Sequence, residues 1–199
     1  PPIETGPHFL LALVVVAGVP ALLEEFLFRG VIQRGYERFG AGVSILLTGV
    51  LFAFLHLSIA SIPSILLMGI LLCYLSYRAD SLWAGAAYHF TNNVIAVTIT
   101  YLSGVLSKMF PMEGMADSLT DIPPEALHMA VVAWGVIGVV SLVLFLTCFT
   151  GFRRITEGKQ KILSRDTGKS AGQKFLQFLP ALLAIIVIVV LLVFEAIEM

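Results

Sequence analysis

Charged residues are scarce in this chain of 199 residues. Asp, Glu, Lys and Arg make up 13% of it, against roughly a quarter of a typical soluble domain, whereas hydrophobic residues make up 58%. A soluble fold of this size cannot bury so much apolar surface, but a bilayer can cover it. The formal net charge of −1 gives no field that favours nucleic acid as a partner. The composition therefore indicates an integral membrane protein of about one domain.

Several patterns that mark other protein classes are missing. The two cysteines, Cys73 and Cys148, both lie in apolar runs, which excludes a disulfide framework. Neither an H-E-x-x-H zinc motif nor a G-x-S-x-G nucleophile elbow is present. All four aspartates fall in predicted turns or loops, which excludes an aspartyl dyad within the membrane. Glutamate, histidine and asparagine remain as the candidates for chemistry.

Six apolar segments approach the length of about 20 residues that a membrane-spanning helix needs. They cover residues 9–39, 43–57, 63–77, 82–102, 127–149 and 175–194. They predict an all-α fold, a polytopic transmembrane helix bundle with about six membrane segments. We expect residues 1–103 to form a four-helix catalytic core and residues 104–125 to form a non-cytoplasmic loop. Residues 126–199 would add two further transmembrane helices joined by a basic cytoplasmic loop.

The first segment is too long for a single crossing. We expect Pro20 to kink it, because proline removes a backbone donor from the helix. Its last turns, with Gln33 and Glu37, are expected to emerge at the membrane interface.

Basic residues are concentrated at one side of the predicted bundle. Alternating crossings place ten of the twelve Lys and Arg residues on the side reached after the first segment, and seven of these lie in the loop 151–174. The loop 104–125 lies opposite, with four acidic residues and a single basic one, Lys108. By the positive-inside rule, the loop 151–174 is cytoplasmic. We predict an integral protein of the plasma membrane in this orientation.

A few strongly polar residues fall deep within the apolar segments. Burying such groups in a bilayer is costly unless they are paired or hydrated, so they usually mark function. Glu24, His56 and Asn93 all lie about 18–21 Å from the predicted cytoplasmic end of their helices, at about 1.5 Å per residue. Three helices therefore bring polar side chains to a similar depth. The full set is Glu24, Glu25, Arg29, His56, His89, Asn92 and Asn93.

Helical spacing divides these residues into pairs. Glu25 and Arg29 are four residues apart and can form a supporting ion pair, while Glu24 is rotated by about 100° onto another face. The same spacing places Phe52 and His56 on one helix face, and His89 and Asn93 on another. We interpret Glu24 and His56 as the pair that activates a water molecule, and His89 and Asn93 as the donors that stabilise an oxyanion. Phe52 would pack against His56 and orient it, and Asn92 would form a helix–helix hydrogen bond.

Three short motifs carry a resemblance to a known family. Residues 24–29 read E-E-x-x-x-R, residues 52–56 read F-x-x-x-H, and residues 89–93 read H-x-x-x-N. In this order they resemble the motifs of the CPBP intramembrane peptidases, which include the type II CAAX prenyl proteases and the bacteriocin-processing or immunity proteins once called Abi. The resemblance implies an intramembrane glutamic endopeptidase in which Glu24 and His56 activate water and His89 and Asn93 stabilise the oxyanion. It covers residues 24–93 and the four helices around them.

The resemblance and the residue chemistry leave two hypotheses on whether the enzyme uses a metal cofactor. The favoured one is a metal-free glutamate mechanism; the other is a metalloprotease in which Glu24, His56 and His89 ligate Zn²⁺ and leave one position open. The expected partners are the lipid bilayer and a membrane-associated peptide or protein substrate, lipidated and CAAX-like or the helix of another protein. A non-enzymatic immunity or scaffold protein and a proton-coupled transporter are the alternatives, since buried Glu and His chains also relay protons.

Overall fold

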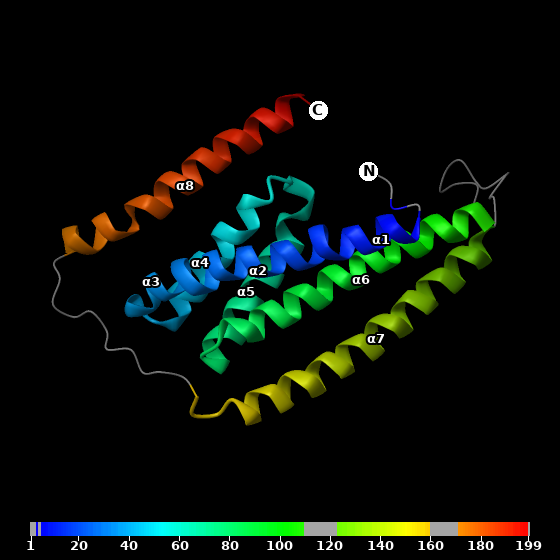
Figure 1. Cartoon of the computed structure of the whole chain (residues 1–199), viewed down its shortest axis with the longest axis horizontal. Helices are drawn as coiled ribbons and strands as arrows, with labels where there is room; N and C mark the ends of the chain where they lie inside the picture. Colours follow the sequence, from blue (N-terminus) through cyan, green and yellow to red (C-terminus); the bar gives the residue numbers. More distant parts are fainter. Residues whose placement is uncertain (1–2, 4, 110–122, 160–170, 199) are drawn as a thin grey trace.

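The computed structural model describes residues 3, 5–109, 123–159 and 171–198 (Figure 1). Over these residues the chain is an all-α membrane helix bundle and contains no strand, as the sequence predicts. Four of its helices are long and apolar enough to cross a membrane, and a shorter apolar helix, α4 (Ala41–Leu55), lies among them. The four are Gly6–Phe39, Ile59–Ala79, Pro124–Ile155 and Leu176–Val193.

The first span is a single helical rod of 34 residues. In chain order it consists of α1 (Gly6–Ala12), η1 (Leu13–Gly18), α2 (Val19–Glu25), η2 (Phe26–Gln33), α3 (Arg34–Tyr36) and η3 (Glu37–Phe39). The irregularity expected at Pro20 is a stretch of π-helical turns in the rod. This stretch, η1, ends just before the α2 turn that contains the proline. The second π-helical stretch, η2, begins directly after Glu25.

Most buried residues of the rod recur at every fourth position, although Ala12 and Phe28 are buried outside this series. In a regular α-helix, positions four apart drift by about 40° per step, so such a series would not stay on one face. The wider π-helical turns, with their i to i+5 bonding, lengthen the repeat and hold the series on one side. The buried series is Ala17, Ala21, Glu25, Arg29, Gln33 and Glu37.

The remaining helices are α5 (Ile62–Ala79), α6 (Leu82–Met109), α7 (Pro124–Ile155) and α8 (Ala171–Glu198). The last three are longer than the sequence indicates, so the ends of the predicted loops 104–125 and 151–174 are helical. Apolar residues continue beyond Gly104, and Arg153 and Arg154 favour the last turn of α7 because basic groups stabilise a helix C-terminus. The middle parts of both loops, 110–122 and 160–170, lie outside the described residues.

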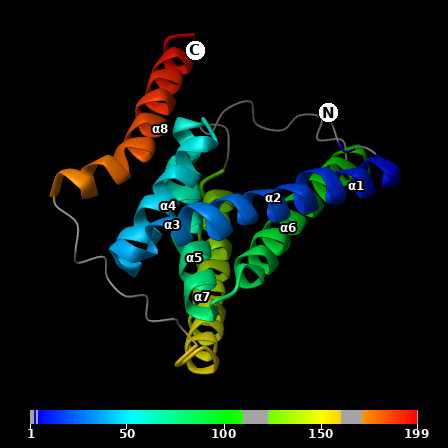
Figure 2. The ribbon, with the colours of Figure 1, turned by 60° about the vertical axis from the view of Figure 1, so that its left-hand side comes forward.

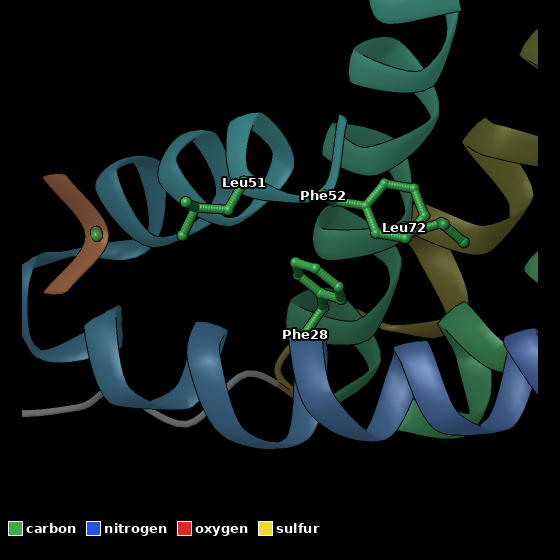
Figure 3. Close-up of a cluster of buried hydrophobic side chains, with 5 residues drawn as sticks. Phe28, Leu51, Phe52 and Leu72 are labelled. Atoms are coloured by element: carbon green, nitrogen blue, oxygen red, sulfur yellow. The ribbon is translucent and has the colours of Figure 1, made fainter. Parts of the chain in front are cut away.

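Helices α4 and α5 approach each other closely through glycine. A Cβ at Gly49 would lie 2.9 Å from Ile70 Cγ1, and a Cβ at Gly69 would lie 3.1 Å from the carbonyl oxygen of Gly49. Such small residues let helix backbones meet in a membrane, where lipid tails compete for every apolar contact. Beside this crossing lies the apolar core of Phe28, Leu51, Phe52 and Leu72, which Ala181 of α8 completes (Figure 3).

Helices α7 and α8 lie at the periphery (Figures 1 and 2). None of the α7 residues is buried, and this helix meets α5 through the rings of Tyr74 and Phe149, 5.4 Å apart, and a 2.8 Å bond from Arg78 Nη2 to the Arg153 carbonyl. The start of α8 contacts the rod, where the Tyr36 hydroxyl donates to the Gln177 carbonyl at 3.3 Å. The compact part of the described chain is therefore the rod with α4, α5 and α6.

We expect Gly49→Ala to destabilise the fold by about 1–3 kcal/mol, because the new methyl group must push α4 away from α5. Gly42→Ala is the matched control on the same helix, since no atom lies within 4 Å of its added Cβ. That variant should be neutral or stabilising by up to about 1 kcal/mol, the helix-propensity gain of alanine over glycine. Unfolding of both variants in detergent measures the difference, and equal stabilities would contradict the close packing.

Candidate active site

The predicted ion pair of Glu25 and Arg29 lies at the centre of the bundle. Arg29 Nη1 is 2.8 Å from Glu25 Oε1, and both side chains are fully buried. The guanidinium also donates to the carbonyl of Gly69 on α5 at 3.3 Å and lies over the Phe52 ring of α4, 4.5 Å from its centroid. Arg29 thus binds a carboxylate, a carbonyl and an aromatic face, and fastens the rod to both neighbouring helices.

Gln33 extends this network. The sequence places Gln33 and Glu37 near the membrane interface, and the structure adds that both are buried against neighbouring helices, with exposed fractions of only 1% and 4%. The Gln33 side chain donates through Nε2 to the Cys73 backbone carbonyl on α5 at 2.9 Å. The backbone carbonyl of Gln33 accepts from Ser44 Oγ on α4 at 2.7 Å. The four-residue repeat of the rod, which continues from Glu25 through Arg29, accounts for the burial.

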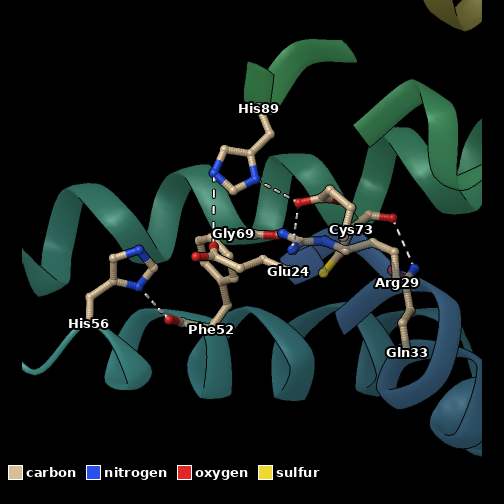
Figure 4. A network of polar contacts seen from close by, with 9 residues as sticks. Glu24, Arg29, Gln33, Phe52, His56, Gly69, Cys73 and His89 are labelled. Atoms are coloured by element: carbon tan, nitrogen blue, oxygen red, sulfur yellow. Dashed lines mark hydrogen bonds and ion pairs between the residues drawn. The ribbon is translucent and has the colours of Figure 1, made fainter. Parts of the chain in front are cut away.

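His89, on α6, lies between the two adjacent glutamates (Figure 4). Its Nδ1 is 2.9 Å from Glu25 Oε1, and its Nε2 is 3.9 Å from Glu24 Oε2. A carboxylate can only accept a hydrogen bond, so the Nδ1 atom carries the proton that bonds to Glu25. The contact joins α6 to the ion pair and turns the Nε2 atom toward Glu24.

His56 follows the last residue of α4, and its backbone caps that helix. Its Nδ1 lies 2.9 Å from the Phe52 carbonyl oxygen (Figure 4). Because a carbonyl oxygen only accepts, Nδ1 must donate, and in the neutral ring Nε2 is then an unprotonated acceptor. The Phe52 ring lies 4.9 Å from the His56 ring and 5.7 Å from the His89 ring, between centroids. Phe52 therefore orients His56 through its backbone as well as its ring.

One cavity brings together the four residues predicted to carry catalysis. Its volume is about 220 Å³, and Glu24, His56, His89 and Asn93 all line it. Glu24 is 28% exposed, and Asn93 Nδ2 donates a long bond of 3.4 Å to the Val16 carbonyl on the rod. Asn92, by contrast, lines a different groove, on a neighbouring face of α6. The cavity has room for several water molecules, each of which occupies about 30 Å³ in the liquid.

The alternative zinc ligands Glu24, His56 and His89 line this cavity, but their side chains are not grouped as a metal site. Among the residues that the structure describes, no three His, Cys, Asp or Glu side chains lie close enough to hold a metal ion. Nδ1 of His89 is already bonded to Glu25, and Nδ1 of His56 to a carbonyl. Glu24, His56 and His89 would have to move closer together to coordinate Zn²⁺.

Residues 6–95 match the family described as type II CAAX prenyl endopeptidase Rce1-like. These residues form an Rce1-like domain. For these residues the match confirms the family predicted from the three motifs, and it supports a CAAX-type intramembrane protease in general terms. It runs from α1 into α6 and includes all four residues named above for the cavity. No curated protein and no solved structure matches the chain.

A glycine that sequence reasoning missed makes room for the polar centre of the Rce1-like domain. A Cβ at Gly85 on α6 would lie 2.5 Å from both Glu25 Oε2 and Ser76 Oγ. These two oxygens are buried and have no hydrogen-bond partner among the described residues. The signal was present in the run of small residues Ala84, Gly85, Ala86 and Ala87, which is typical of close helix packing in membranes.

We expect Gly85→Ala to displace the Glu25 carboxylate and weaken its bond to His89. The Rce1-like domain should lose about 1–3 kcal/mol of stability through overpacking, and the peptidase activity should fall at least about tenfold. Gly104→Ala is the control on the same helix, since its Cβ would make only an ordinary contact of 3.8 Å. Thermal unfolding and a cleavage assay on both proteins check this, and a fully active Gly85→Ala enzyme would show that Glu25 does not need its present position.

Proposed function

We propose that the Rce1-like domain hydrolyses a peptide bond of membrane-associated, lipidated substrates of the CAAX type, with Glu24 and His56 activating water and His89 and Asn93 stabilising the oxyanion. The observation that carries the proposal is the convergence of these four side chains, from three separate helices, on one cavity. Polar groups in apolar helices are costly, and a shared catalytic task accounts for all four together.

Water activation follows from the acceptors in the cavity. Glu24 Oε2 has no hydrogen-bond partner among the described residues, and Nε2 of neutral His56 is an acceptor because Nδ1 donates to Phe52. A water molecule between them donates one hydrogen bond to each acceptor and keeps both protons, which directs an oxygen lone pair at the scissile carbonyl. As the oxygen attacks, Glu24 takes a proton as general base and later returns it to the leaving amine.

Oxyanion stabilisation falls to His89 and Asn93, which lie four residues apart on α6. The Asn93 carboxamide makes only a long bond to Val16, so it can turn to donate to the oxyanion. His89 already donates Nδ1–H to Glu25, so it needs a second proton on Nε2 to serve as a donor. One such donor accelerates related reactions by about 10²–10³. The buried pair of Glu25 and Arg29 positions His89.

The proposed orientation rests on charge. Arg34, Arg38 and Arg78 lie near the same end of the helices as Arg153 and Arg154 in the last turn of α7. We propose that this end, and with it the basic loop 151–174, faces the cytoplasm from the plasma membrane.

The direct test is cleavage of a farnesylated peptide with a C-terminal Cys-a-a-X sequence by protein purified in detergent. Glu24→Gln removes the general base and His56→Ala removes its partner, so each should lower kcat by about 10²–10⁴. Glu125→Gln and His128→Ala, both at exposed positions of α7, are the matched controls and should retain activity. If both cavity variants cleave as fast as the controls while folding normally, the assignment of the site is wrong.

Metal dependence is tested separately, with the same peptide. Under the glutamate mechanism, prolonged chelation leaves kcat unchanged and elemental analysis of active protein finds less than one metal ion per chain. Loss of activity on chelation, with recovery on adding Zn²⁺ alone, would instead support the set Glu24, His56 and His89 as zinc ligands.

A further inference from the structure

Helix α6 carries two polar pairs that point to different spaces. His89 and Asn93 face the catalytic cavity, whereas Tyr88 and Asn92 line a groove of about 640 Å³. Members of each pair are four residues apart and share a face, and the one-residue offset turns the two faces by about 100°. The groove lies between α5, α6 and α7, with Ser64, Leu67 and Phe145 among its other walls.

The groove lies next to the catalytic cavity. Met68 of α5 lines both spaces and is the wall between them. Away from the cavity, the groove joins a second, largely apolar space of about 280 Å³, with which it shares Leu71, Tyr88 and Phe145. A flexible methionine side chain can give way to a ligand that passes from the groove to the reacting centre.

Two polar groups that α6 contributes to the groove lack partners among the described residues, whereas Ser64 of α5 donates to the Ser61 carbonyl at 2.9 Å. Neither the Tyr88 hydroxyl nor the Asn92 carboxamide has a hydrogen-bond partner among the described residues. The threonines of the same helix differ, since Thr91, Thr98 and Thr100 donate to carbonyls of α6 itself at 2.8, 2.7 and 2.9 Å. A polar group beside hydrocarbon is costly unless it is satisfied, so the groove suits a ligand with donors and acceptors of its own.

We propose that this groove binds the extended backbone of the substrate peptide next to the scissile bond, with Tyr88 and Asn92 hydrogen-bonded to its peptide groups. The inference rests on the proposed function and adds the path of the substrate. A peptide held by Tyr88 and Asn92 on one face of α6 crosses Met68 and presents its next carbonyl to His89 and Asn93. A purely apolar chain would fill the groove but leave both polar groups unsatisfied.

The loose attachment of α7 gives the peptide a way in. This helix closes the groove with Phe145, yet none of its residues is buried. An outward movement of α7 therefore exposes little buried surface and breaks few contacts. The substrate can enter from the bilayer between α6 and α7 and need not pass through the compact part of the bundle.

A kinetic comparison tests the role of Asn92. With the farnesylated Cys-a-a-X peptide, Asn92→Leu should raise KM about three- to tenfold, the loss of one hydrogen bond, and leave kcat within about twofold. Thr91→Val is the matched control, because it removes a polar group of the same turn that bonds within α6 and lines neither space. Equal KM values for the two variants would overturn the proposal.

A cross-linking experiment keeps docking separate from chemistry. In the inactive Glu24→Gln protein, a benzoylphenylalanine probe replaces Tyr88 in the groove or Phe90, which lies on another face of α6 near Gly18. The probe at position 88 should label the amino-acid portion of the farnesylated peptide, and an excess of unlabelled peptide should suppress the labelling. The probe at position 90 should not label it.

The outcomes separate the two proposals. Cleavage by the wild-type protein without labelling from position 88 would overturn the docking path and leave the catalytic assignment standing. Labelling from position 88 without cleavage would support docking and remove the hydrolytic function. Labelling confined to the farnesyl chain would also overturn the inference, because the groove would then hold lipid and not peptide.

Discussion

The buried ion pair of Glu25 and Arg29 is the constraint on which the rest of the site depends. Neither charge can reach water, so each must be satisfied by the other and by groups from neighbouring helices. Arg29 does this through Gly69 and Phe52, and Glu25 does it through His89. The rod, α4, α5 and α6 therefore meet at one electrostatic centre. Removing either charge would leave the other buried and unpaired, so the centre holds helix positions as well as charge.

The two histidines near this centre differ in the group that accepts a hydrogen bond from Nδ1. His56 gives its Nδ1 proton to a backbone carbonyl, which leaves the neutral ring with a free acceptor facing the cavity. His89 donates the same Nδ1 proton to a carboxylate, that of Glu25, which turns its Nε2 atom toward Glu24. Both rings contact Phe52, which lies against Arg29 as well. One aromatic side chain thus connects the supporting charges with both proton-handling groups.

Much of this arrangement could be predicted from the sequence, because it depends on spacing along single helices. The pairing of Glu25 with Arg29 and the shared face of His89 and Asn93 follow from four-residue separations, and similar depths in the bilayer indicated that Glu24, His56 and Asn93 meet. Contacts between helices could not be predicted in this way. The burial of Gln33, the bond of His89 to Glu25 and the clearance at Gly85 depend on how closely α5 and α6 approach the rod. The helix ends near Met109 and Ile155 were also missed, although basic residues in the last turns, Lys108 in α6 and Arg153 with Arg154 in α7, are typical of a helix C-terminus.

The four-residue repeat of the first helix has a consequence for how such a protein can change over time. A single inserted or deleted residue turns every later side chain by about 100°, which would exchange the surroundings of Glu24 and Glu25. Blocks of about four or seven residues keep the buried face roughly aligned. A lineage that adapts to a thicker or thinner membrane can therefore alter the buried part of this rod only in coarse steps, of roughly 6 Å or more, and the bilayer must accommodate any smaller mismatch.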